Sequence, residues 1–250
     1  MAICSGISCF GSIGLNSLRR INEISTILLD MNQTFMFGAD RFGATEDYSV
    51  IYRQLGGTME RSRVNQLIGA AYDYLDVRYP DPKYRELFPT LREALIGGAM
   101  FGPLSEVELA LLTETFARYE LGTVPPEYAA AIAQLSQHFR LGLVIDIWAP
   151  KTLWVETLEQ CGVLLVCESA SFSSDCGIVK PSPLPFLKVL AEMQVDRQDA
   201  VMVGDSVRRD LGGATAAGID CILVGGAKHS SALGAVDDLI QLVELVAPDS

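Results

Sequence analysis

Two apolar runs, far apart in the chain, each stop abruptly at an aspartate. Residues 26–30 read TILLD, and residues 200–205 read AVMVGD. Runs rich in Ile, Leu and Val suit strands that are buried on both faces of a parallel sheet. Each aspartate would then follow the carboxyl end of its strand, at the edge of an open α/β sheet where ligands bind. The pattern therefore predicts an α/β fold with Asp30 and Asp205 at one sheet edge.

The second half of the chain alternates between strand-like and helical segments. Alternation of this kind is typical of a doubly wound parallel sheet. We expect strands over 141–147, 164–167, 200–203 and 221–224, and helices over 150–161, 183–193, 211–217 and 235–246.

A helical pattern fills the long stretch between the first strand and the rest of the sheet. Apolar residues recur there at helical spacing, as in the stripe Val64, Leu67, Ile68, Ala71 and Leu75. Pro and Gly pairs divide the stretch into short helices. The expected organisation is an N-terminal extension over 1–20, an α/β core over 21–37 and 124–250, and a small all-helical cap over 38–123.

Three segments, taken in chain order, resemble the motifs of the haloacid dehalogenase (HAD) superfamily. Residues 30–34 read DMNQT, similar to the first motif, Asp-x-Asp-x-Thr. Residues 177–183 read GIVKPSP, similar to the third motif, in which a lysine precedes a helix started by proline. Residues 204–210 read GDSVRRD, which matches the fourth, metal-binding motif in full. The resemblance implies a Rossmann-like core, and a helical cap that closes over the active site and selects small-molecule substrates.

The resemblance also implies a reaction and a role for each residue. Asp30 would attack phosphorus, and Lys180 would bind the phosphoryl group and neutralise the developing charge. The implied cofactor is Mg²⁺, held by Asp30, by Asp205 and by the main-chain carbonyl of Asn32. Asp210 would either join the metal or orient Lys180. Carboxylate oxygens are ligands that suit Mg²⁺.

The first motif departs from the family pattern at its second acidic position, where Asn32 replaces an aspartate. The family residue protonates the leaving alcohol and later activates water. An amide has no proton that titrates near neutral pH, so Asn32 can do neither. General acid–base help is typically worth about 10²- to 10⁴-fold in rate. We therefore expect slow hydrolysis of ordinary phosphomonoesters. Gln33 also replaces a glycine that is common in the family, which leaves the geometry of this turn open.

The second motif departs as well. Residues 141–147 supply the expected strand, but the usual Ser/Thr-Asn pair is Ile145-Asp146. Isoleucine has no hydroxyl to donate to a phosphoryl oxygen, so Asp146 or a backbone N–H would have to make that contact. Asp146 is equally well explained as a structural turn residue. In the same way, Lys180 would fit a surface lysine at a helix start, and Asp210 a helix-capping acid.

Three interpretations of the function remain open on these residues. The first is a Mg²⁺-dependent hydrolase, a phosphatase for a small phosphorylated metabolite, in which Asp146, Asp40 or Asp47 supplies the proton or the leaving group needs none. The second is a weak or inactive relative that binds a phosphorylated ligand or a protein partner. The third is dehalogenase or phosphonatase chemistry at Asp30. The complete metal motif and the lack of a Schiff-base lysine early in the cap argue against the third.

Composition limits the possible partners. The 250 residues carry a formal charge of −12 with no cluster of Lys or Arg, which argues against binding to nucleic acid or to an anionic membrane surface. The 49% apolar and 20% charged contents are those of a globular protein, and we expect a monomer or a weak dimer.

The six scattered cysteines form no C-x-x-C pair, and we interpret them as buried thiols of a reducing compartment. Arg19 and Arg20 follow the mildly apolar start instead of preceding it, unlike a secretory signal. We therefore expect a cytoplasmic protein, although the sequence leaves an organellar transit role for residues 1–20 open.

Overall fold

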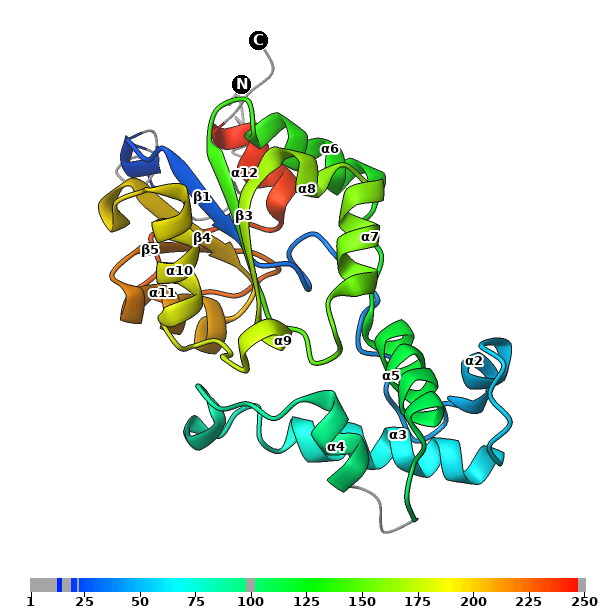
Figure 1. The fold of residues 1–250 in the computed structure, drawn as a ribbon. Helices are drawn as coiled ribbons and strands as arrows, with labels where there is room; N and C mark the ends of the chain where they lie inside the picture. Colours follow the sequence, from blue (N-terminus) through cyan, green and yellow to red (C-terminus); the bar gives the residue numbers. More distant parts are fainter. Residues whose placement is uncertain (1–12, 15–18, 22, 98–101, 247–250) are drawn as a thin grey trace, which may run out of the picture.

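The computed structural model describes residues 13–14, 19–21, 23–97 and 102–246. Its centre is a six-stranded sheet in the order β3-β2-β1-β4-β5-β6, in which every pair of neighbours is parallel (Figure 1). The strands are β1 Thr26–Leu29, β2 Arg140–Ile145, β3 Cys167–Phe172, β4 Ala200–Gly204, β5 Asp220–Leu223 and β6 Gly234–Ala235. The α/β, doubly wound architecture expected from the sequence is therefore confirmed.

Helices cover both faces of this sheet (Figure 1). Alternate side chains of each strand point to opposite faces, so Leu28, Val144 and Met202 pack in one cluster with α10 and α11, while Leu29, Leu143 and Val203 pack in the other. The core helices are α6 Pro126–Leu135, α7 Thr152–Gln160, α8 Val163–Val166, α9 Ser173–Cys176, α10 Leu184–Met193, a π-helical turn Val207–Leu211, α11 Gly212–Ala217 and α12 Leu239–Val246, with a 3-10 turn Arg197–Asp199 before β4.

The proposed cap over 38–123 is drawn as a separate group of helices beside the sheet (Figure 1). Its helices are α2 Ser49–Gln54, α3 Arg61–Asp76, α4 Leu91–Gly97 and α5 Glu106–Glu120, with a 3-10 turn Pro82–Tyr84. Helix α5 begins with a full capping box, because Ser105 and Glu108 exchange side-chain-to-backbone hydrogen bonds. The two connections to the core meet in an antiparallel bridge between Phe37 and Thr123.

Two of the expected elements near the sheet edges are wrong. Of residues 164–167, expected as a strand, 164–166 belong to the helical turn α8 Val163–Val166, and the strand β3 begins at Cys167 and runs to Phe172. β3 is an edge strand with several partly exposed side chains, so its sequence lacks the apolar run of a central strand. The last helix begins at Leu239 and not at Ala235, since residues 234–235 pair with β5 as β6.

The expectation that the cysteines are buried is also wrong in part. Cys221 is buried in β5, Cys161 and Cys167 are partly exposed, and Cys176 is exposed at the end of α9, the short helix on the loop after β3. Cys4, Cys9 and most of the N-terminal extension lie outside the described residues. No helix in the described part of the chain has the length and apolar character needed to cross a membrane.

Glycine at position 142 is required by the packing of β2 against α10. A Cβ atom there would lie 2.6 Å from Val189 Cγ1 and 2.9 Å from Leu28 Cδ2. Gly142→Ala should therefore lower the free energy of unfolding by about 1–3 kcal/mol, the usual cost of overpacking. Urea unfolding measures this change.

Gly69, inside helix α3, is the matched control, because a Cβ there meets nothing within 4 Å. Gly69→Ala should be neutral or stabilise by about 0.5–1 kcal/mol, since alanine loses less backbone entropy in a helix. Equal stability of the two variants would contradict the packing account.

Candidate active site

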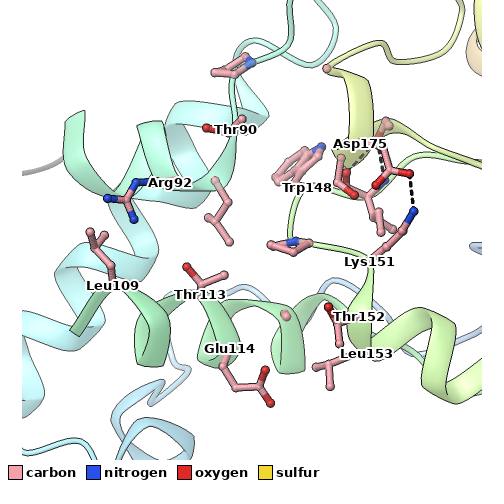
Figure 2. A pocket seen from close by; sticks show the side chains of 18 of the residues that line it. Thr90, Arg92, Leu109, Thr113, Glu114, Trp148, Lys151, Thr152, Leu153 and Asp175 are labelled. Atoms are coloured by element: carbon pink, nitrogen blue, oxygen red, sulfur yellow. Dashed lines mark hydrogen bonds and ion pairs between the residues drawn. The ribbon is translucent and has the colours of Figure 1, made fainter. Parts of the chain in front are cut away.

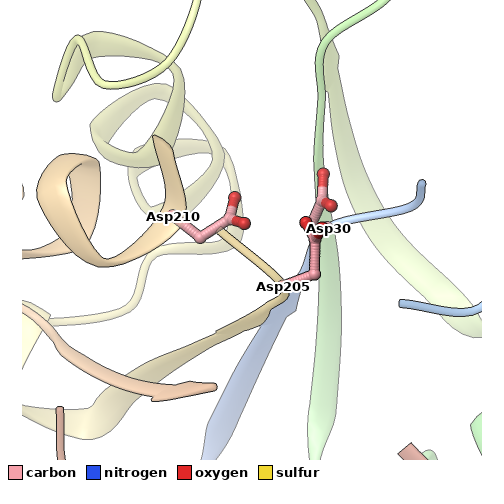
Figure 3. A group of neighbouring side chains, drawn as sticks. All are labelled: Asp30, Asp205 and Asp210. Carbon is pink, nitrogen blue, oxygen red and sulfur yellow. The ribbon is translucent and has the colours of Figure 1, made fainter. Parts of the chain in front are cut away.

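The aspartates that end β1 and β4 come together at the carboxyl edge of the sheet. β1 and β4 are neighbours, with Leu29 opposite Val203, and the N–H of Asp30 donates to the carbonyl of Val203 at 2.9 Å. Asp205 follows β4, and Asp210 lies in the π-helical turn after it (Figure 3). Ligand oxygens of these three carboxylates lie within 4.8 Å of one another. The sheet topology thus places three of the expected site residues side by side.

Lys180 reaches this cluster from the loop before α10, and its side chain is fully buried. The Nζ atom donates to Asp30 Oδ1, to Asp210 Oδ1 at 2.8 Å and to the carbonyl of Val144 at 3.1 Å. Both carboxylates form ion pairs with it. Within the described structure Lys180 is therefore no surface lysine, and all of its donors are directed at the sheet edge.

The charged groups in this cluster shift one another's pKa values. Burial alone would lower the pKa of Lys180, but the carboxylates of Asp210, Asp30 and Asp146 raise it above its ordinary value, so the ammonium stays charged. Burial, reinforced by Asp30, raises the pKa of Asp210, and Lys180 opposes this effect. The arrangement holds a fixed positive charge against the side chain of Asp30.

Asp210 uses both of its oxygens inside the protein. Oδ1 accepts from Lys180, and Oδ2 accepts from the backbone N–H of Ser206 at 2.9 Å. Gly204 has no side chain because a Cβ there would collide with the carboxylate of Asp210. Of the two roles implied by the resemblance, this geometry favours the orientation of Lys180.

A divalent cation would fit beside Asp205 and Asn32. Oδ1 of Asp205 and Oδ1 of Asn32 are buried and make no hydrogen bond, which is costly for carboxylate and amide oxygens unless a ligand meets them. The nearest cationic group to Asp205 is Arg209, whose Nη2 lies 3.5 Å from Oδ1. Hard oxygen ligands of this kind suit Mg²⁺.

The turn after Asp30 tolerates the loss of the family glycine. Gln33 takes a left-handed conformation, with φ at 60°, which is the conformation that a glycine would adopt most easily. Its backbone N–H donates to the carbonyl of Met36 at 2.9 Å. The hydroxyl of Thr34 lies 3.5 Å from Oδ2 of Asp30, so this turn still supports the carboxylate.

The second motif contacts the cap. Ile145 is buried and offers no polar atom to a ligand through its side chain. Oδ2 of Asp146 accepts from the hydroxyl of Tyr79 at 2.6 Å, and the N–H of Lys180 also donates to Asp146. Burial raises the pKa of Asp146, although Lys180 and Tyr79 act in the opposite direction. A substrate contact by Asp146 would therefore have to replace the hydroxyl of Tyr79.

Tyr79 and Arg209 were not identified from the sequence. Arg209 Nη1 donates to the hydroxyl of Tyr79 at 3.2 Å, so this cap residue joins the second and fourth motifs. Tyr79 follows helix α3 in a turn that has no motif, and only its contacts in the folded chain reveal its role. Arg209 lies within the matched fourth motif at a variable position, which gave some indication of a site residue.

The other acids proposed as proton donors lie elsewhere. Asp47 accepts from the hydroxyl of Ser49 at 2.6 Å and from the amide of Asn65 at 3.2 Å, so it fixes the start of α2 inside the cap. Asp40 is exposed near the start of the proposed cap, where its N–H donates to the carbonyl of Glu120. Asp146 is the one of these three that contacts Lys180.

Glu120 joins the last turn of the cap helix α5 to the loop after β2. Its carboxylate is buried and accepts from the N–H of Trp148 at 2.6 Å and from the N–H of Ala149 at 2.9 Å. Burial raises the pKa of Glu120 to about 8, even though both N–H groups lower it. The sequence gave no signal for this residue, because a glutamate at a helix end is usually solvated.

Comparisons with known proteins relate the chain to the superfamily that its motifs resemble. Residues 178–242 match the HAD-hydrolase-like family model. The chain is similar to a phosphoglycolate phosphatase of Cupriavidus necator, 35% identical over 51% of this chain and 58% of the relative. It is also similar to a glyceraldehyde 3-phosphate phosphatase of Methanopyrus kandleri, 28% identical over 49% and 52%. The aligned segments span just over half the length of these two relatives.

Solved structures show the same fold over nearly the whole chain. A HAD phosphatase from Thermococcus onnurineus superimposes with a TM-score of 0.61 at 20% identity, covering 90% of this chain and 99% of the other. A 2-haloacid dehalogenase from Pseudomonas syringae gives a TM-score of 0.59 at 24% identity, over 90% and 98%. The resemblance to the HAD superfamily is thus confirmed: this chain has the fold of HAD-family hydrolases, and phosphatases are among its relatives.

The buried carboxylate of Glu120 gives a prediction for stability. The pKa of about 8 in the folded state exceeds the ordinary value of 4.5, so between these pH values the folded protein holds a proton that the unfolded chain releases. Raising the pH through this window should therefore lower the free energy of unfolding of the wild type relative to Glu120→Gln. Urea unfolding near each end of the window measures the difference.

Glu114 lies six residues earlier on the same helix and is partly exposed, which makes Glu114→Gln the matched control. This variant should follow the pH dependence of the wild type. A difference between wild type and Glu120→Gln that stays constant with pH would contradict the account of Glu120.

Proposed function

We propose that this protein is a Mg²⁺-dependent phosphatase that acts on a small phosphorylated metabolite through an aspartyl-phosphate intermediate. The observation that carries the proposal is the buried contact of Lys180 with Asp30 and Asp210, beside a carboxylate oxygen of Asp205 that makes no hydrogen bond. The phosphatases among the relatives support the same reaction class.

In the proposed reaction, an oxygen of Asp30 forms a bond to phosphorus while the bond from phosphorus to the ester oxygen breaks. Lys180 contacts Asp30 directly, so its charge would offset the negative charge of the phosphoryl group as it approaches. Water then attacks phosphorus, and the bond to Asp30 breaks to release phosphate. Mg²⁺ would add further charge compensation, and the residues proposed to hold it are Asp30, Asn32 and Asp205. Asp210, whose two oxygens already accept from Lys180 and Ser206, would orient Lys180 instead.

Proton transfer is the part of this reaction that the site supports least. Asn32 cannot donate a proton to the leaving oxygen or take one from water. Asp146 is the acid closest to the role, because its pKa is raised by burial and it contacts both Lys180 and Tyr79. Its use would require the cap to release the hydroxyl of Tyr79. We therefore expect acyl phosphates, whose leaving group needs no proton, to phosphorylate Asp30 faster than monoesters do. Hydrolysis of the aspartyl phosphate, for which Asn32 cannot activate water, should then limit turnover.

A second candidate is a weak or inactive relative that binds a phosphorylated ligand. The buried side chain of Ile145, which cannot hydrogen-bond to a phosphoryl oxygen, favours it together with Asn32. The intact contacts of Lys180 argue for retained chemistry. Turnover separates the two candidates.

Phosphate release with Mg²⁺ from a panel of phosphate monoesters and acyl phosphates tests the proposal. Asp30→Asn should abolish turnover, because the amide is not a nucleophile. Asn32→Asp should raise monoester turnover by about 10²- to 10⁴-fold, the range of general acid–base catalysis.

Absence of turnover on every compound of the panel, together with Mg²⁺-dependent binding of inorganic phosphate, would favour the binding protein instead. Turnover that survives Asp30→Asn would exclude Asp30 as the nucleophile.

A further inference from the structure

A cavity of about 720 Å³ lies between the proposed cap and the core, apart from the catalytic carboxylates. Its walls come from cap helices α4 and α5, from the start of α7, from α9 and from the loop that joins β2 to α7 (Figure 2). Asp30, Lys180, Asp205 and Asp210 are not among the residues that line it. Its volume falls in the range of small-molecule sites.

The lining offers apolar surface and no free charge. Leu91 and Leu109 from the cap face Ile147, Trp148 and Leu153 from the core. The threonine hydroxyls at 90, 113 and 152 add neutral polar groups.

Each of the five charged lining residues already has an ion-pair partner. Two pairs are formed within the lining, Arg92 with Glu106 and Lys151 with Asp175, both at 2.6 Å, and the second pair is drawn in Figure 2. Glu114 pairs with Arg118 at 2.9 Å. The lining therefore presents no unpaired charge to a ligand, and its largely apolar surface favours a neutral, mainly apolar molecule.

Aromatic side chains connect the cavity to the catalytic centre. Trp148 and Phe88 line the cavity, and both rings pack against Tyr79, with centroid separations of 5.6 and 5.7 Å. Trp148 follows Asp146 by two residues, and the hydroxyl of Tyr79 donates to Asp146. One wall of the cavity is therefore continuous with the contact between the cap and the second motif.

We infer that this cavity binds a neutral, apolar small molecule, which holds the cap in its closed position with Tyr79 on Asp146. The physical reason is that one wall of the cavity belongs to the proposed cap and the other to the core. A ligand that contacts both walls binds best when they stand at the present separation, so it shifts the population toward this closed state. The site is separate from the one in the proposed function, and it does not depend on turnover.

The neutral fluorescent probe N-phenyl-1-naphthylamine tests the binding. Its emission should rise in a saturable titration of the full chain. Ala110→Trp fills the cavity from an exposed position on α5 and should weaken binding by about tenfold or more, equivalent to about 1.4 kcal/mol. Thr113→Trp, one turn later in the lining, provides a second blocking variant. Val107→Trp is the control, because Val107 is 70% exposed on the same helix and does not line the cavity.

Hydrogen exchange tests the effect on the cap. The N–H of Phe88 donates to the carbonyl of Gly177 at 2.7 Å, and the N–H of Val179 donates to the carbonyl of Arg85 at 2.9 Å, so both amides report contact between cap and core. Bound probe should slow their exchange in the wild type and in Val107→Trp, and leave it unchanged in the two blocking variants. Absence of saturable binding, equal binding by the blocking variants, or binding without slower exchange would each overturn the inference.

Discussion

The charge of one buried lysine organises the carboxyl edge of the sheet. Lys180 is fully buried, and a buried ammonium is tolerated only where carboxylates and carbonyls surround it. Its partners come from three separate segments, because Asp30 follows β1, Val144 lies in β2 and Asp210 follows β4. Satisfying this ammonium therefore fixes the third motif, to which Lys180 belongs, against the segments of the other three. The carboxylate of Asp205 lies next to that framework.

The replacements at 32 and 145 lie beside this framework and do not break it. Neither Asn32 nor Ile145 contributes a side-chain atom to the partners of Lys180, so both changes leave the arrangement of the charges intact. At position 32 the family aspartate that transfers protons is lost. At position 145 the family hydroxyl that donates a hydrogen bond to the phosphoryl group is lost. The geometry of the site and the rate of its chemistry are thus separable. Because Tyr79 of the proposed cap contacts Asp146, the cap also affects that rate if Asp146 transfers the proton.

The sheet and its charged residues could be predicted because apolar runs and motif spacing are local signals. Asp30, Asp205 and Asp210 follow strands or turns whose sequences specify them, and Lys180 precedes a proline. Tyr79 and Glu120 could not be found in this way, since each acts through a contact with a segment more than 25 residues away. The helical turn at 163–166 was misassigned for a related reason: a short apolar run suits a buried strand and a helix equally well, and packing decides between them.

The most direct test of the separation between site and rate is a search for the phosphorylated intermediate. We would incubate the protein with acetyl phosphate and Mg²⁺ and map the phosphoryl group by mass spectrometry. The account predicts that phosphate accumulates on Asp30 in the wild type, because Asn32 cannot activate the water that removes it, and that the adduct decays faster in Asn32→Asp. An adduct that persists in Asp30→Asn, or no adduct at all in the wild type, would contradict the account.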